Sequence, residues 1–169
     1  FLRTRMKRYT SCRYPAMIIR PGLENFINDF VVFDPLYIID RNYAMLEPAM
    51  AEFTPEYKRR LRPYTITETE DYPILEKIPN NQFGVCLAYN FFNFKPFEII
   101  KKYLEEIYQK LSPGGVLIMT FNDCDREKAV KLAEMNYSPY TPGSLVIALA
   151  QKVGYEVVYK HHDDGPSTR

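Results

Sequence analysis

The stretch from Ile99 to Cys124 constrains the fold most, because patterns for a helix, a turn and a buried strand follow one another directly. Apolar residues recur every three or four positions up to Leu111, which predicts a helix with one buried face. The sequence SPGG at 112–115 predicts the end of that helix, because proline cannot continue it and glycine accepts a left-handed cap. The almost entirely apolar run 116–121 then predicts a strand covered on both faces, as in parallel sheets.

Further strand candidates are short apolar or β-branched runs at 15–19, 35–40, 64–67, 83–89 and 154–159. We expect helices between them, over 23–30, 42–53, 74–78, 126–135 and 143–152, with Pro48 kinking or splitting the second. The acidic run 68–71 reads as a solvated loop. Alternating strands and helices predict an α/β fold, namely a doubly wound, mostly parallel Rossmann-like sheet with helices on both faces.

Composition favours an ordinary globular protein. With 169 residues, 46% of them hydrophobic and 25% charged, the chain can bury one core and is not disordered. No apolar run approaches the roughly 20 residues that span a bilayer, and no secretory signal is visible, so a cytoplasmic protein is expected. The net charge of +1 gives no global electrostatic argument for a membrane or nucleic-acid partner.

Metal and disulfide chemistry are not expected. The three cysteines lack CxxC spacing, which argues against both a disulfide framework and a zinc site. The run His161–Asp164 contains metal-ligating residue types, but neighbours on an extended segment point to opposite sides, so a solvated loop is favoured.

Residues 1–14 are locally basic without an acidic residue among them, and we expect a short helix within them. The cations are Arg3, Arg5, Lys7, Arg8 and Arg13. Such an arm can contact phosphates of a nucleic acid or dock on a protein partner, and a solvated or docked extension is the simpler interpretation. We therefore expect a basic arm at 1–14, one α/β domain at 15–160 and a tail at 161–169. The start at Phe1 and the tail's composition indicate a processed or cut fragment.

Several elements fall in an informative order. A strand ends in the acid Asp40, a later strand leads into a polar and aromatic loop, LSPGGVLI follows an amphipathic helix at 111–118, and Gly-Tyr-Glu-Val begins the last strand. Together, over roughly residues 15–160, they resemble the class I S-adenosylmethionine-dependent methyltransferase superfamily. The resemblance implies methyl transfer with S-adenosylmethionine as cofactor, on a substrate that it does not identify.

The resemblance also implies where the cofactor binds. In that superfamily a glycine-rich loop after the first strand lies against the methionine part of the cofactor. Here the loop has one glycine, Gly22, and Arg20 can either meet the cofactor's carboxylate or fill its place. Asp40 matches the acid that binds the ribose hydroxyls, although an acid there also caps helices. Ala88, at the end of the fourth strand, is the remaining cofactor-binding candidate.

The catalytic candidates are Tyr89, Asn90 and Asp123. The run 88–92 is faintly similar to the Asn-Pro-Pro-Tyr motif of amino-group methyltransferases, without its prolines. Its aromatic residues suit a planar substrate, or else a role in the core or an interface. Asp123 and Asp125 can serve as acid and base or cap the next helix.

Two functions therefore stay open: a divergent methyltransferase, or an inactive methyltransferase-like domain that serves as a structural or assembly component, for example of a viral particle. The superfamily's closing strand has no counterpart after Tyr159. We expect a partner to cover the sheet edge left by its absence.

Overall fold

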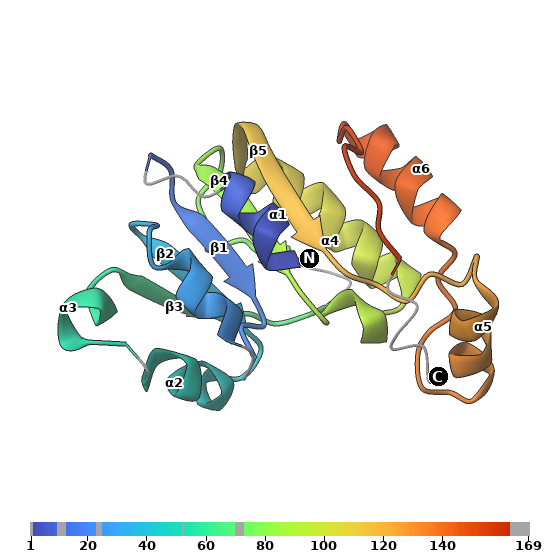
Figure 1. The fold of residues 1–169 in the computed structure, drawn as a ribbon, viewed down its shortest axis with the longest axis horizontal. Helices are drawn as coiled ribbons and strands as arrows, with labels where there is room; N and C mark the ends of the chain where they lie inside the picture. Colours follow the sequence, from blue (N-terminus) through green and yellow to red (C-terminus); the bar gives the residue numbers. More distant parts are fainter. Residues whose placement is uncertain (1, 10–12, 23–24, 52, 70–72, 163–169) are drawn as a thin grey trace.

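The computed structural model describes residues 2–9, 13–22, 25–51, 53–69 and 73–162. Its centre is a parallel sheet of five strands in the order β3-β2-β1-β4-β5 (Figure 1). The strands are β1 (Ala16–Ile19), β2 (Leu36–Asp40), β3 (Leu61–Thr65), β4 (Phe83–Ala88) and β5 (Leu111–Met119). The central strands β1 and β4 consist mostly of buried apolar residues, as strands with both faces covered do.

Helices and connecting segments cover both faces of the sheet, as the sequence predicts. In Figure 1 α1 (Leu2–Tyr9) lies in front of the sheet and α4 (Phe97–Lys110) behind it. The short η1 (Asn25–Phe30) and α2 (Tyr43–Ala51) pack on the face of α1, and α6 (Gly143–Val153) packs beside α4. The remaining helices are α3 (Pro55–Lys58), η2 (Phe92–Phe94) and α5 (Glu127–Glu134).

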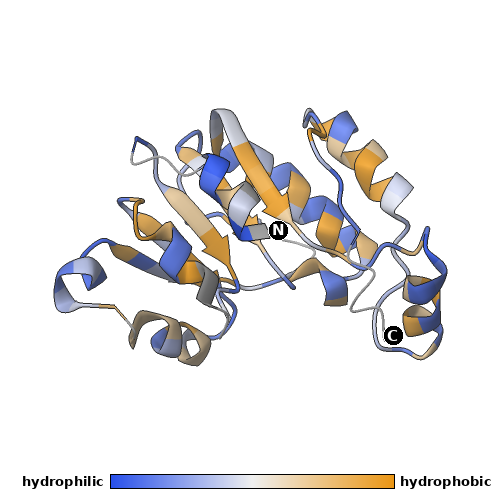
Figure 2. Cartoon of the chain, in the orientation of Figure 1, coloured by the Kyte–Doolittle hydropathy of each residue, from blue (hydrophilic) through white to orange (hydrophobic). Residues whose placement is uncertain are grey.

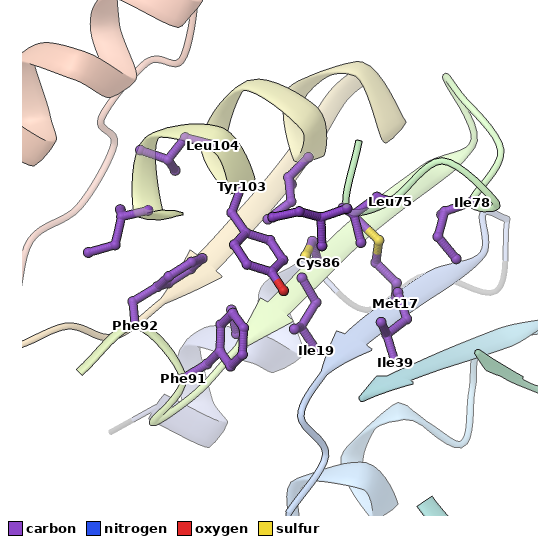
Figure 3. Packing of buried hydrophobic residues seen from close by; sticks show 14 of the residues in the cluster. Met17, Ile19, Ile39, Leu75, Ile78, Cys86, Phe91, Phe92, Tyr103 and Leu104 are labelled. Atoms are coloured by element: carbon purple, nitrogen blue, oxygen red, sulfur yellow. The ribbon is translucent and has the colours of Figure 1, made fainter. Parts of the chain in front are cut away.

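Side-chain alternation along the strands divides the core into two clusters. Met17 and Ile19 of β1 point to the cluster under α4 and α6, and Ala16 and Ile18 point to the cluster under α1, η1 and α2. Figure 3 shows the first cluster, where Tyr103 of α4 packs against the strands. Apolar residues are concentrated in the strands, while the helices carry alternating apolar and polar residues (Figure 2). The doubly wound α/β fold is therefore confirmed.

The SPGG element differs from its expected form. Helix α4 ends at Lys110, and β5 starts at once with Leu111, which pairs with Phe83. The SPGG residues then bulge out of the ladder, and pairing resumes between Val116 and Val85. Glycine is required here because a Cβ on Gly115 would lie 2.6 Å from the carbonyl oxygen of Phe83. The turn thus lies inside the strand rather than before it.

Three further expectations need correction. Residues 154–159 are extended but join no strand ladder in the described part of the chain, so the prediction of a sixth strand is wrong. Residues 74–78 form turns rather than the predicted helix. The backbone N–H groups of Ile74 and Leu75 donate to the Glu106 carboxylate. The helix expected at 23–30 is a 3₁₀ helix from Asn25, and Leu23 and Glu24 lie outside the described residues.

The basic segment forms the expected short helix and packs on the domain. Met6 of α1 is 1% exposed within the core cluster, and the Arg3 side chain lies 3.2 Å from the Asp29 carboxylate of η1. Contact of this helix with a nucleic acid or a protein stays a prediction. None of the described helices has the length and apolar character needed to cross a membrane.

Candidate functional site

The carboxyl ends of all five strands meet at one edge of the sheet because the strands are parallel. The order reverses beside β1, with β2 and β3 on one side and β4 and β5 on the other. The loops after β1 and β4 lead to opposite faces of the sheet. We call the place between these two loops the switch point. Open α/β sheets bind ligands at such a point.

The loop after β1 turns through two residues in the left-handed region, Arg20 at φ 55° and Gly22 at φ 62°. Glycine adopts this region readily, whereas a residue with a Cβ is strained there. The backbone N–H of Arg20 donates to the carbonyl oxygen of Ile39 at 2.7 Å, which holds the loop against the end of β2. The loop therefore has two left-handed residues although only one of them is glycine.

The Arg20 side chain reaches across the switch point toward the loop after β4. Its Nη1 donates to the carbonyl oxygen of Asn90 at 3.3 Å. Its Cζ lies 5.9 Å from the ring centroid of Phe94, near the outer limit of a cation–π contact. Arg20 thus joins the two loops between which a ligand would enter.

Asp40 is half-buried at the last position of β2. Its Oδ1 accepts from the backbone N–H of Asn42 at 3.0 Å, and the Asn42 side chain in turn accepts from the N–H of Ala44 at 3.0 Å. Asn42 thereby caps α2, and Asp40 fixes the turn that precedes the cap. Among the described residues no donor binds the Oδ2 atom of Asp40, which leaves this oxygen for a ligand.

The end of β4 carries three predicted site residues. Ala88 is fully buried and pairs with Met119, whereas Tyr89 is half-buried against the core cluster under α1 and α2. Asn90 is left-handed at φ 48°, and its backbone N–H donates to Oγ1 of Thr120 at 2.8 Å. The loop after β4 is therefore fixed to the end of β5.

The aromatic residues that follow are mostly core. Phe91 and Phe92 are 4% and 1% exposed, and their rings meet Tyr103 edge-on at 5.0 and 5.6 Å (Figure 3). The core interpretation is confirmed for these two residues. Phe94 is 57% exposed and is the ring that Arg20 covers, so it is the aromatic side chain of this loop that a ligand can reach.

Glu68 lies at the same edge and is not in a solvated loop, contrary to the expectation for 68–71. Its side chain is 9% exposed and accepts hydrogen bonds from Lys95 at 2.7 Å, the Tyr103 hydroxyl at 2.8 Å and Arg41 at 3.0 Å. One carboxylate therefore joins the segments after β2, β3 and β4. Sequence patterns do not reveal this, because its partners lie 27 or 35 positions away. Glu70 and Asp71 lie outside the described residues.

The protonation of this cluster is well defined. Burial raises the pKa of Glu68, but hydrogen bonds from Lys95, Tyr103 and Arg41 outweigh burial and hold its pKa below the ordinary value. Burial and the neighbouring Glu68 carboxylate raise the pKa of the Tyr103 phenol. At neutral pH the cluster therefore contains a carboxylate, a neutral phenol and two cations, which makes it a fixed arrangement of charges rather than a proton-transfer pair.

Asp123, the catalytic candidate after β5, holds two distant segments. Its Oδ1 accepts from the backbone N–H of Gly143 at 2.8 Å, and Gly143 is the first residue of α6. Its Oδ2 lies 3.0 Å from Nζ of Lys160 and 3.7 Å from Nδ1 of His162. The carboxylate therefore caps α6 and attaches the extended segment 154–162 to the end of β5.

The chemistry of Asp123 follows from these contacts. Burial raises its pKa, but backbone N–H donors and Lys160 hold the pKa below the ordinary value. A general base works best when its pKa lies near the working pH, so this geometry supports a structural role better than proton abstraction. Asp125 also accepts from the first turn of α6, through the N–H of Ser144 at 2.6 Å. Both acids thus cap α6, and not the next helix along the chain.

The described residues contain no group of three His, Cys, Asp or Glu side chains that could hold a metal ion. Asp163 and Asp164, which belong to the acidic and histidine-containing run, lie outside these residues.

No protein-family model and no curated protein sequence matches this chain. Solved structures do match its fold. An S-adenosylmethionine-dependent methyltransferase from Leishmania major matches with a TM-score of 0.69 at 14% identity, over 99% of this chain and 67% of that protein. A second such enzyme, from Archaeoglobus fulgidus, has a TM-score of 0.67 at 12% identity and covers 92% of this chain and 68% of its own.

Phosphoethanolamine N-methyltransferase 2 from Haemonchus contortus, solved with S-adenosylmethionine, matches with a TM-score of 0.65 at 16% identity. This match covers 88% of the present chain but 35% of the nematode enzyme, so the domain spans about a third of that protein. The fold is therefore that of class I methyltransferases, as the resemblance implies. At these identities the likeness shows the fold alone.

Proposed function

We propose that this domain is an S-adenosylmethionine-dependent methyltransferase that binds its cofactor at the switch point. The observation that carries the proposal is the loop after β1, in which Arg20 and Gly22 are left-handed. The loop begins directly after Ile19, which is the register partner of Ile39 in β2, and Asp40 follows Ile39. This places a backbone turn and a half-satisfied carboxylate side by side at the carboxyl edge. The methyltransferases that share the fold support the same assignment.

In this proposal four residues contact the cofactor. Gly22 lets it approach the backbone of the β1 loop, because glycine has no side chain to obstruct it. The free oxygen of Asp40 accepts hydrogen bonds from the ribose hydroxyls. Ala88 presents only backbone and a methyl group at the end of β4, and Arg20 lies at the amino-acid end of the cofactor.

When bound, the cofactor would supply an electrophilic methyl group, carried on a sulfonium, for transfer to a nucleophile of the substrate. The protein's task is then mainly alignment, so no strong base is needed. Tyr89 and Asn90 are placed to orient the substrate, because both lie at the end of β4. Asp123 supports the adjoining edge by holding α6 in place.

Isothermal titration calorimetry with S-adenosylmethionine and S-adenosylhomocysteine tests the proposal. Binding tighter than about 1 mM, a free energy of roughly 4 kcal/mol, is expected for both. Asp40→Asn should weaken binding about tenfold, since a neutral amide accepts a weaker hydrogen bond than a carboxylate. Asp34→Asn is the matched control, because Asp34 is exposed just before the amino end of the same strand.

Failure of both compounds to bind at millimolar concentration would overturn the proposal. Equal effects of the two Asp→Asn substitutions would remove Asp40 from the cofactor site.

A second function, as an assembly component, is favoured by the unequal edges of the sheet. Edge strand β3 carries Arg62 and Pro63 and follows several basic residues, all features that discourage strand addition. Edge strand β5 has no charged residue, and the nearby segment 154–162 joins no ladder in the described chain. Val158, in the segment 154–162, is 63% exposed. We propose as the alternative that a strand from a partner adds at this edge.

Sedimentation velocity against protein concentration tests this alternative with a second copy of the chain as the partner. Val158→Lys should weaken self-association, since it puts a charge on the segment that Lys160 attaches to Asp123 beyond the end of β5. Tyr137→Lys is the control, because Tyr137 is 68% exposed after α5. A monomer at all concentrations would argue against pairing between copies.

A further inference from the structure

A strongly basic run leads into the edge strand β3. Residues 57–67 hold four cations and no acidic residue, and all four side chains are exposed: Lys58, Arg59, Arg60 and Arg62. Arg60 lies 3.5 Å from the Asp34 carboxylate, whereas Lys58 and Arg59 bind no acidic side chain in the described part of the chain. This edge of the sheet therefore carries positive charge that the protein does not neutralise locally, although the whole chain is almost neutral.

One of these cations lies beside two aromatic rings on the surface of the sheet. Arg62 is the register partner of Tyr37, and Tyr64 is two positions further along β3, so side-chain alternation puts all three on one face. The rings of Tyr37 and Tyr64 stack, with centroids 5.5 Å apart and an angle of 6° between their planes. Phe83 meets the Tyr37 ring edge-on at 4.9 Å and holds it from the other side.

The outer side of this aromatic pair has no strand against it. Tyr64 is half-buried in the last strand of the sheet, and no other ring among the described residues stacks on it. In Figure 1 α4 and α6, which cover this face over β4 and β5, lie away from β3. A planar group of a ligand can therefore continue the stack on Tyr64.

The Arg62 guanidinium is held in place and still has donors for a ligand. Its Nη1 donates to the carbonyl oxygens of Arg59 at 2.7 Å and Leu61 at 3.0 Å. Its Nε and Nη2 have no partner in the described chain. Phosphate oxygens accept charge-assisted bonds from such a group. A ligand that offers both phosphates and planar rings matches this combination of cations and aromatic side chains.

We propose that this surface binds single-stranded nucleic acid. We call it the β3 surface, and it comprises Tyr37, Lys58, Arg59, Arg62 and Tyr64. A base stacks on the outer face of Tyr64, and the neighbouring phosphates bind the three cations. Bases in a duplex stack on one another and cannot reach the ring, so the surface selects single strands.

The β3 surface is separate from the other sites of the protein. It shares no residue with the switch point, and it lies on the face of the sheet opposite to the basic helix α1. The inference therefore goes beyond the proposed function and does not depend on cofactor binding.

Fluorescence anisotropy of the whole chain with labelled oligo(U) and oligo(dT) of about 12 nucleotides tests the proposal. Both single strands should bind at least about tenfold more tightly than oligo(dT) annealed to oligo(dA). A surface that acts by charge alone would instead prefer the duplex, because the duplex has the higher density of phosphates.

Two variants separate the charges from the ring. Lys58→Gln, Arg59→Gln and Arg62→Gln together should weaken oligo(U) binding at least about tenfold and reduce the slope of log K against log salt by about 2, since each lost phosphate contact removes about 0.7. Tyr64→Leu keeps the apolar packing and removes the ring, so it should weaken binding at least about fivefold. Tyr64→Phe keeps the ring and should bind as the natural protein does.

A second triple variant is the matched control, because it removes three exposed positive charges from helices away from β3: Lys101→Gln in α4, Lys128→Gln in α5 and Lys152→Gln in α6. Its affinity should stay within about twofold of the natural protein, since salt screens distant charges. Thermal unfolding of each variant shows whether the fold is retained.

Equal losses in the two triple variants, tighter binding of the duplex than of the single strands, or an unchanged affinity in Tyr64→Leu would each overturn the proposal. Competition by a poly-glutamate peptide as effective as that by unlabelled oligo(U) would also overturn it, in favour of an acidic protein partner.

Discussion

Replacing Glu68 by Gln tests whether the buried carboxylate stabilises the carboxyl edge. The substitution keeps the shape of the side chain and an acceptor for the Tyr103 hydroxyl, and it removes the charge that faces Lys95 and Arg41. Lys95 would then be nearly buried without its counter-ion, because its side chain is 12% exposed. We expect the variant to fold with a reduced free energy of unfolding.

The expected loss follows from the exposure of each partner. Breaking a fully buried ion pair costs about 3–5 kcal/mol. Arg41 is 61% exposed, so its share is about 0–1 kcal/mol. Because the retained acceptor and nearby solvent soften the penalty on Lys95, we expect a loss of about 2–3 kcal/mol.

Urea unfolding at pH 7, followed by circular dichroism, measures this loss. Glu127→Gln is the matched control, since its ion pair with Lys131 joins side chains that are 82% and 62% exposed. That pair should contribute no more than about 0.5 kcal/mol. Equal losses in the two variants would refute the assignment of Glu68 as a buried, stabilising charge.

The same comparison has a pH dependence of known sign. The folded-state pKa of Glu68 lies below its ordinary value, so its charge stabilises the fold above the unfolded-state pKa. This stabilisation is lost as the pH falls through the folded-state pKa. The difference between the natural protein and Glu68→Gln should therefore be constant near neutral pH and shrink below about pH 4.3. A difference that grows on acidification would contradict the reasoning.

Two further predictions concern the core. Gly143→Ala should lower the free energy of unfolding by at least about 2 kcal/mol, because the new Cβ would lie 2.3 Å from Oδ1 of Asp123. Two backbone N–H groups hold this oxygen, and Lys160 holds the other oxygen of the same carboxylate. Urea unfolding measures the loss, and an unchanged midpoint would show that Asp123 moves freely. Cys86 and Cys124 should resist alkylation in the native state and react in denaturant, because both are buried and burial raises the pKa of the Cys86 thiol. Mass spectrometry of labelled peptides checks this. Rapid labelling of Cys86 in the native protein would contradict its burial.

Much of the fold can be predicted from the sequence, because secondary structure depends on local patterns. Apolar spacing predicts helix α4 and the second half of strand β5, and the alternation of strands and helices predicts the sheet. It does not predict that β5 starts at Leu111, because that start depends on pairing with Phe83 of β4. The segment 154–159 has an equally good strand pattern and still forms no strand. A strand requires a neighbour that satisfies its backbone hydrogen bonds, and local sequence does not supply one.

The site divides in the same way. The sequence alone predicts that Arg20, Asp40 and Asn90 lie at or just after the ends of three strands, and therefore at one edge of a parallel sheet. Only the tertiary structure decides what those residues contact. The partners of Glu68 lie 27 or 35 positions away, and Asp123 caps a helix that begins 20 positions later. Such contacts depend on how elements pack in space, whereas a sequence pattern reports only the few residues around it.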